Sequence, residues 1–434
     1  MKIGSQESPA QLAISTLIGS TIVQSKTCFG CNYASSYPYD MNNSTTVLPI
    51  SCDSYECQSN TCGRRDCDGT CQPSTHACCA KSDKSICGFG LEFMSNIEVY
   101  GSVIRDNIMF QTTTGWSTPY PTTIGYIDRI VGTYKEKDGL LGLAYKSKGC
   151  DPSCFNTYFD DMVDTISGMN NIFTMCFGNN DGILTYGGID KDLYYGNITW
   201  INLIGDGFYS VEFNDIRVNN ISMFHSIETR YAYFNTMDFA ISLQSDLYQS
   251  IVEYLKTNYC HLPSICGKQT IFENYCLTSP PSSDWPSIDI YLNGIPISLS
   301  PDLYFIPLPD KDNTIYCFAI NKLTSGEDVN TFGSSLMRGF TFVFDKEQDR
   351  IGIATPSSSC HATSLGGINR LFITSLPDKH FLNNYIIIYC ITLAIILQYR
   401  SYHNKVQFVN EKSINNNSLD LSSQSLTNQK HSTI

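Results

Sequence analysis

Cysteines restrict this chain more than any other residue type does. Nineteen are present in 434 residues, and ten of them lie between Cys28 and Cys87. Without Cys390, which lies in an apolar segment near the C-terminus, eighteen remain, an even number as complete pairing requires. Because reducing compartments keep thiols free, this density predicts a disulfide-rich domain in an oxidising compartment.

Zinc binding is the alternative interpretation of the same cysteines. Cys28 and Cys31 are separated by two residues, a ligand spacing found in zinc ribbons. Such ribbons need a second close pair at a defined distance, and the other spacings here are irregular. The seven histidines also lack metal-ligand spacing, and no His-Glu-x-x-His sequence occurs. We therefore expect disulfides, and neither a metal nor another cofactor.

Composition limits the fold class and the partners. Apolar residues make up 42% of the chain and charged residues 16%, so most of it can bury a core. The net charge of −13 repels phosphate backbones, which argues against a nucleic-acid partner. Abundant Tyr, Phe and Gly favour strands and turns over helical bundles.

An apolar segment near the C-terminus predicts a transmembrane helix at residues 381–398. It is about as long as the minimum of roughly 17 residues for crossing a bilayer. Arg400 and Lys405 follow it, at the start of a polar tail at 399–434. A buried helix or a strand pair of the domain is the alternative. We expect a single-pass membrane protein with its bulk on the luminal or extracellular side.

The N-terminal sequence MKIGSQESPAQ lacks the charged start and apolar run of a secretory signal peptide. Disulfides require an oxidising compartment, and a chain needs a targeting signal to reach one. We therefore expect either that the true start lies upstream or that the segment at 381–398 is the targeting element. Asn-x-Ser/Thr sequons, which accept glycans in a luminal protein, include those that begin at Asn42, Asn43, Asn197 and Asn220.

Two weakly similar halves are visible along the chain. In each, an apolar strand leads to a Thr-containing turn, and a hydrophobic-hydrophobic-Gly element follows about a hundred residues later. In chain order the four elements span Leu12–Ser20, Asp138–Ala144, Ala232–Leu243 and Asn330–Ser335. Turn residues between β-rich runs predict hairpins at Phe173–Asp190 and Thr341–Ala354. Apolar spacing predicts a helix over Ser245–Tyr259, capped by Ser245, and a second over Cys154–Ile166.

These elements, in this order, resemble the pepsin-like (A1) aspartic peptidases, and most closely their cysteine-rich, membrane-anchored members. The resemblance covers about Lys2 to Ala354 and implies two β-barrel-like lobes. It divides the chain into an N-terminal lobe (1–198, with a cysteine-rich insert at about 28–87), a C-terminal lobe (199–358), a juxtamembrane linker (359–380), the transmembrane helix and the tail.

The chemistry of the family needs two carboxylates that share a proton, one from an Asp-Thr/Ser-Gly turn in each lobe. In this chain Ser15-Thr16-Leu17 stands at the first turn and Asn235-Thr236-Met237 at the second. Both threonines are kept, but both acids and both glycines are replaced. Ser and Asn have no acidic proton near neutral pH, so the resemblance predicts a catalytically inactive chain.

Asp238 is the one nearby acid in the second turn, and a shift of register would be needed to use it. The first half offers no Asp or Glu from Ser8 to Tyr39, so a dyad cannot form locally. In the hairpin that covers the cleft in the family, Phe93 replaces the hydrogen-bonding Tyr and Gly101 keeps its place. We expect Phe93 and Gly101 to contact a bound substrate or ligand; Phe93 can pack over it but cannot donate a hydrogen bond.

The sequence leaves three hypotheses open. The first is a silent, monomeric relative of aspartic peptidases that binds an extended peptide or a protein partner between its lobes. The second is an active aspartic endopeptidase in which Asp238 and a distant acid form a non-standard dyad. The third is a decayed copy without a folded product.

Overall fold

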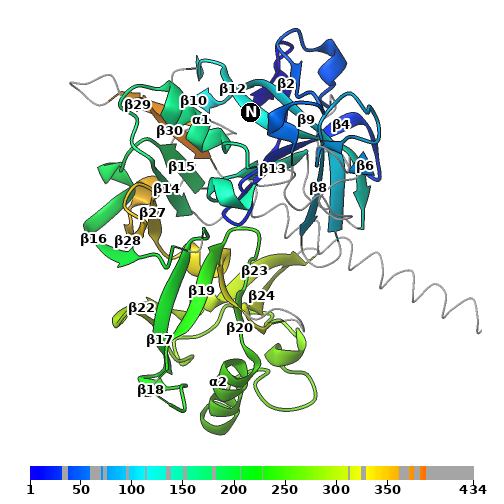
Figure 1. Ribbon diagram of the computed structural model, residues 1–434. Coiled ribbons are helices and arrows are strands. Elements are labelled where there is room, and N and C mark those ends of the chain that lie inside the picture. Colours follow the sequence, from blue (N-terminus) through cyan, green and yellow to red (C-terminus); the bar gives the residue numbers. More distant parts are fainter. Residues whose placement is uncertain are drawn as a thin grey trace, which may run out of the picture.

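The computed structural model describes residues 1–387 with short gaps. The gaps are at 32–37, 59–69, 72–75, 94–96, 113–114, 133–137, 150–153, 178–181, 206, 227, 311–312, 324–328, 361–370 and 376–381. The described chain is mostly β and has two lobes joined by a central sheet (Figure 1). The fold class predicted from sequence is therefore confirmed at this level.

The N-terminal lobe is built on a nine-stranded sheet of order β2-β1-β9-β12-β4-β13-β3, in which β5 and β8 also pair with β9. Its core combines the long strands β9 and β12 with the short β13, whose four residues are all buried. The strands are β1 (Lys2–Ile3), β2 (Ser8–Pro9), β3 (Leu12–Ser15), β4 (Thr21–Phe29), β5 (Leu48–Pro49), β8 (Gly88–Phe93), β9 (Ile97–Met109), β12 (Tyr120–Val131) and β13 (Gly139–Gly142).

The C-terminal lobe is built on an eight-stranded sheet of order β22-β21-β17-β19-β26-β20-β25, with β18 beside β17. Its strands are β17 (Ser210–Val218), β18 (Ile221–Ser222), β19 (Arg230–Asn235), β20 (Ile241–Leu243), β21 (Ile288–Leu292), β22 (Ile295–Leu299), β25 (Ile320–Lys322) and β26 (Asn330–Gly333). Three small two-stranded sheets also occur among the described residues: β6 (Thr70–Cys71) with β7 (Cys78–Cys79), β10 (Gln111–Thr112) with β11 (Gly115–Trp116), and β23 (Phe305–Asp310) with β24 (Asn313–Phe318).

The two lobes repeat one arrangement of strands. In the first, β13 runs parallel to β3 and antiparallel to β4; in the second, β26 runs parallel to β19 and antiparallel to β20. The glycines that end β13 and β26 allow the backbone of a neighbouring segment to approach closely. A Cβ on Gly142 would lie 2.5 Å from the Gly19 carbonyl oxygen, and one on Gly333 would lie 2.2 Å from that of Ala240. The two halves predicted from sequence are thus structural repeats.

The central sheet joins the lobes and has the order β16-β28-β27-β14-β15-β30-β29. Both predicted hairpins, β14 with β15 and β27 with β28, are confirmed in it. Aromatic rings hold its middle together, since Phe173 and Phe344 stack at 4.6 Å between ring centroids. The strands are β14 (Ile172–Phe177), β15 (Gly182–Tyr186), β16 (Tyr194–Asn202), β27 (Thr341–Asp345), β28 (Arg350–Pro356), β29 (Leu371–Ser375) and β30 (Leu382–Ile387).

The last two strands differ from what the sequence predicts. β29 lies within the predicted linker, and β30 occupies the first part of the predicted transmembrane helix at 381–398. The backbone of β30 pairs with β15 and β29, so the apolar residues there complete a sheet. Residues 388–398 lie outside the described residues, and membrane anchoring stays a prediction. In the part of the chain that the structure describes, no helix is long and apolar enough to cross a bilayer.

Helices are short and few in the described chain: α1 (Tyr158–Thr165), α2 (Ser245–Asn258), α3 (Pro301–Tyr304) and α4 (Ser334–Met337). Single 3₁₀ turns occur at Met41–Asn43, Tyr55–Cys57, Lys146–Lys148, Lys191–Leu193, Ile271–Glu273 and Ser358–Cys360. The helix predicted from Cys154 begins at Tyr158 instead, because Thr157 and Asp160 form a capping box there. Ser245 is the first residue of α2 rather than its cap.

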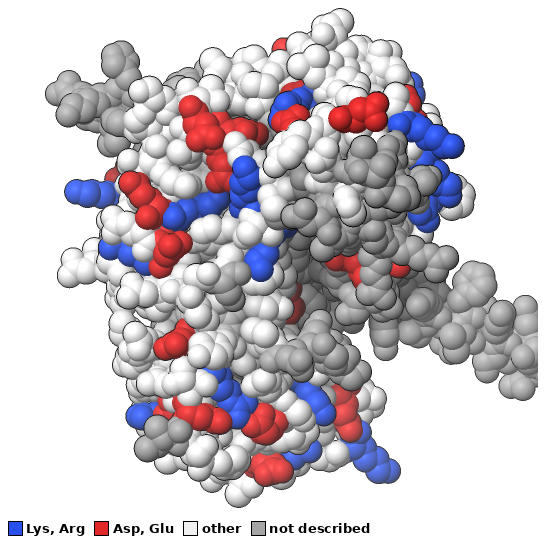
Figure 2. Space-filling view, in the orientation of Figure 1, with Lys and Arg blue, Asp and Glu red and all other residues white. Residues whose placement is uncertain are grey.

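Six disulfides join pairs of described cysteines, which confirms that the chain is disulfide-bonded. They are Cys28–Cys31, Cys52–Cys79, Cys57–Cys87, Cys176–Cys360, Cys260–Cys266 and Cys276–Cys317. The two cysteines with zinc-ligand spacing are therefore bonded to each other. Acidic and basic side chains are interspersed on the face drawn in Figure 2.

Candidate functional site

The candidate site lies where the two repeats meet, at the turn after β3 and the turn after β19. Ser15 ends β3 beside Gly142 of β13, and Asn235 ends β19 beside Gly333 of β26. Each turn thus begins where the parallel pairing of its strand, β3 with β13 or β19 with β26, ends. This arrangement places Ser15 and Asn235 at equivalent positions in the two lobes.

Two threonines tie the turns together through four hydrogen bonds. The Thr16 hydroxyl donates to the Phe234 carbonyl (2.7 Å), and the Thr236 hydroxyl donates to the Ile14 carbonyl (2.6 Å). Each hydroxyl oxygen also accepts from the backbone N–H of the other threonine, at 3.1 Å in both cases. The cross-link has the same donors and acceptors in both directions, and it fixes the turns against each other.

Neutral side chains, Ser15 and Asn235, directly precede the two cross-linked threonines, at the positions where the family has its two acids. Ser15 is completely buried, and its hydroxyl oxygen accepts from the N–H groups of Leu17 (3.3 Å) and Ile18 (3.1 Å). Asn235 is 8% exposed, and its carboxamide oxygen accepts from the Met237 N–H at 2.9 Å. Neither group ionises in the ordinary pH range, so this pair cannot share a proton as two carboxylates do.

Asp238 is held by its own lobe. One carboxylate oxygen accepts from the Ala240 N–H (3.0 Å), and the other accepts from the hydroxyls of Ser242 (3.0 Å) and Thr331 (3.1 Å). The Asp238 carbonyl also accepts from the Ser334 N–H. Through these bonds Asp238 links the second turn to β20 and β26 and fixes its conformation.

Apolar side chains take the place of the two glycines. Leu17 and Met237 are half-buried and pack against a cluster of buried residues in the N-terminal lobe, together with Leu91, Ile97 and Phe155. Leu91 and Ile97 come from β8 and β9, the two strands of the predicted covering hairpin. Met237 of the second turn and Leu17 of the first therefore contact one apolar cluster, which belongs to the N-terminal lobe.

The covering hairpin forms as predicted, with Phe93 paired to Ile97 where β8 ends. The tip, 94–96, lies outside the described residues. Gly101 lies further along β9, where a Cβ would meet the Tyr126 carbonyl oxygen at 2.0 Å. Its small size is required by the packing of β9 on β12, so the position predicted for ligand contact has a structural reason to be glycine.

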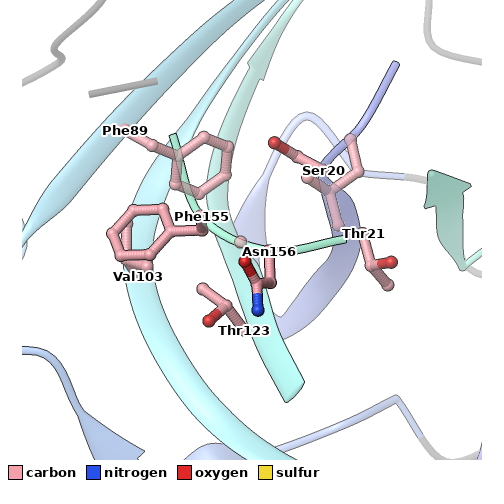
Figure 3. A pocket seen from close by; sticks show the side chains of 9 residues that line it. Ser20, Thr21, Phe89, Val103, Thr123, Phe155 and Asn156 are labelled. Atoms are coloured by element: carbon pink, nitrogen blue, oxygen red, sulfur yellow. The ribbon is translucent and has the colours of Figure 1, made fainter. Parts of the chain in front are cut away.

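A cavity of about 20 Å³ lies beside the first turn. Figure 3 shows Phe89 and Phe155 on one side of it and Ser20 and Thr21 on the other. The Thr21 hydroxyl is buried and has no hydrogen-bond partner among the described residues. The volume is that of one water molecule, too small for a peptide side chain.

Tyr209, directly before β17, is hydrogen-bonded to the N-terminal lobe. Its hydroxyl donates to the Leu143 carbonyl at 2.6 Å, directly after β13. Burial, and secondarily the neighbouring Tyr145 and Asp160, raises the pKa of Tyr209 well above its usual value. It therefore stays a neutral donor at any physiological pH.

Comparison with known proteins identifies the family of the chain. The family model described as eukaryotic aspartyl protease matches residues 52–356. The chain belongs to this family. The match includes Asn235 and Asp238 and begins after Ser15, so the first turn is placed by its cross-link to the second rather than by the family match.

Individual relatives are distant. The chain is 24% identical over 231 residues to gastricsin of Rattus norvegicus, covering 51% of this chain and 55% of that protein. Pepsin A of Sus scrofa is 25% identical over 226 residues, covering 51% and 54%. Pepsin B of Canis lupus familiaris is 22% identical over 330 residues, covering 74% and 77%. The chain spans about half the length of most curated relatives it matches.

Proposed function

We propose that this aspartyl protease family member is catalytically silent and binds an extended peptide or a protein partner in the cleft between its lobes. The observation that carries the proposal is the threonine cross-link, with Ser15 and Asn235 at the two positions that it presents. A water molecule there has no base to deprotonate it, and a scissile carbonyl has no acid to polarise it. The proposal places the bulk of a single-pass membrane protein on the luminal or extracellular side.

The apolar surroundings of the turns support binding. Leu17 and Met237 would offer contact area to an apolar side chain, and strand edges nearby would pair with an extended backbone. A ligand held this way loses water from apolar surface, which is favourable by about 25 cal/mol per Å² buried. Nothing in this contact requires bond cleavage.

A cleavage assay at pH 3–5 tests the proposal. The purified chain is incubated with a peptide library, with and without a pepstatin-type inhibitor, and we expect no inhibitor-sensitive product. Peptides retained by the chain should lose affinity by about tenfold or more in Met237→Lys, because a charge would replace an apolar contact. Ile221→Lys, on a hairpin that is already exposed, is the matched control and should bind normally. Inhibitor-sensitive cleavage by the unaltered chain would refute the silent assignment.

Asp238 separates this proposal from the alternative of an active endopeptidase. We expect Asp238→Asn to lower the free energy of unfolding by about 1–3 kcal/mol, because a carboxamide cannot accept all three bonds. Chemical denaturation measures this, with Glu253→Gln on the exposed face of α2 as the control. Peptide binding should persist. If the unaltered chain cleaves peptides and Asp238→Asn abolishes that at unchanged stability, the alternative is right.

A further inference from the structure

Strand β16 forms one edge of the central sheet, at the left side of Figure 1, and it carries an irregular exposed segment. Tyr195 pairs with Thr355 and Thr199 pairs with Ile353, so residues 196–198 face a single residue of β28. Gly196 has a φ of +73°, which permits the bulge. The bulge interrupts the ladder just where Asn197 begins its sequon.

The surface around this bulge is open. Tyr195 is 60% exposed, and Gly196 and Asn197 are exposed as well. In the part of the chain that the structure describes, a Cβ placed on Gly196 would meet no atom within 4 Å. A bulky group on Asn197 would therefore find space beside a large aromatic side chain.

The three other sequons within the described residues have different surroundings. The carboxamides of Asn42 and Asn43 donate to Asp40, and Ser44, the third residue of the first sequon, is buried. Asn220 lies in the tight turn between β17 and β18, where the residue two positions earlier, Val218, is buried. Of these four sequons, all of which lie within the described residues, the one at Asn197 has an exposed aromatic residue two positions before the asparagine.

We propose that Asn197 is an N-glycosylation site and that the first sugar of its glycan packs against the ring of Tyr195. The donor is a lipid-linked oligosaccharide diphosphate. A bond forms between the Asn197 amide nitrogen and the sugar C1, the C1–O bond to the diphosphate breaks, and the nitrogen loses a proton. The apolar face of a sugar ring gains contact on an aromatic face that otherwise faces water.

The glycan would also protect this edge of the sheet. An exposed edge strand presents unpaired backbone groups to other chains, and a bulky polar substituent there blocks such pairing. The inference rests on the luminal placement in the proposed function, which the six disulfides favour because they form in oxidising compartments.

To test the site, the full chain is expressed in animal cells with an added signal peptide that is cleaved on secretion. The result then depends neither on peptide binding nor on how the native protein is targeted. Peptide mass spectrometry should find a glycan on Asn197, and Asn197→Gln and Thr199→Val should each remove it, while Asn220→Gln should leave it. Tyr195→Ala should lower the unfolding midpoint of the glycosylated chain by about 1–2 °C and have no effect in the Asn197→Gln background. An unmodified Asn197, or equal effects of Tyr195→Ala in both backgrounds, would overturn the proposal.

Discussion

A chain with Ser15→Asp, Leu17→Gly, Asn235→Asp and Met237→Gly should cleave peptides at acidic pH, at a rate at least about 100-fold above the unaltered chain. The cross-linked turns already supply the geometry, and the four changes supply two acids and the space that they need. Hydrolysis of a fluorogenic peptide at pH 3–5 measures the effect, and a pepstatin-type inhibitor should block it.

The local bonds favour this outcome. Asn235 and an aspartate have the same shape, so Asn235→Asp would keep the bond from the backbone N–H of residue 237 and exchange a carboxamide nitrogen for an oxygen. Ser15 accepts two backbone N–H groups, which an ionised carboxylate would accept more strongly. Because Ser15 is completely buried, the larger acid needs the room that Leu17→Gly provides.

The matched control is the double change of Ser15 and Asn235 to Asp alone. We expect it to stay at least about tenfold less active than the fourfold variant, because Leu17 and Met237 still crowd the attacking water. Adding Thr16→Val to the fourfold variant should abolish the gain, since the hydroxyl's bonds to the other turn are lost. A fourfold variant that folds, keeps its disulfides and shows no cleavage would mean that the two turns do not face one another as the cross-link implies.

The turns show why sequence predicted so much of this fold. The Thr-containing turns, and the glycines in the elements Asp138–Ala144 and Asn330–Ser335, are local patterns. The structure shows a steric cause for these glycines. Gly142 and Gly333 permit contacts that any Cβ would prevent. Hairpins such as β14–β15 depend on residues close together in the chain, so their patterns are readable without tertiary information.

Other features depend on distant partners and leave no local pattern. Asp238 resembles a surface acid in sequence, and only its bonds to Ser242 and Thr331 reveal its role in the turn. The segment at 382–387 leads into an apolar run of the length that a membrane helix needs, and its pairing with β15 cannot be read from composition. Lys346 stands in a charged run, DKEQDR, that is typical of an exposed hairpin turn.

The structure instead buries Lys346, and Lys346→Met should lower the free energy of unfolding by about 3–5 kcal/mol. The side chain is 3% exposed, and its ammonium group donates to Asp160 at 2.7 Å. Asp160 lies in α1 of the N-terminal lobe, whereas Lys346 follows β27. Without the lysine, a carboxylate that is 18% exposed loses its charged partner, and the attachment of α1 to the central sheet weakens.

Chemical denaturation of three variants measures this cost. Lys191→Met, at an exposed lysine, should change stability by less than about 0.5 kcal/mol. Lys346→Met with Asp160→Asn should be more stable than Lys346→Met alone, because the carboxamide removes the unpaired charge and still accepts the Thr157 N–H of the capping box. Equal losses in the single and double variants would show that Lys346 stabilises the fold through its ammonium group over the rings of Tyr145 and Phe159 rather than through its ion pair with Asp160.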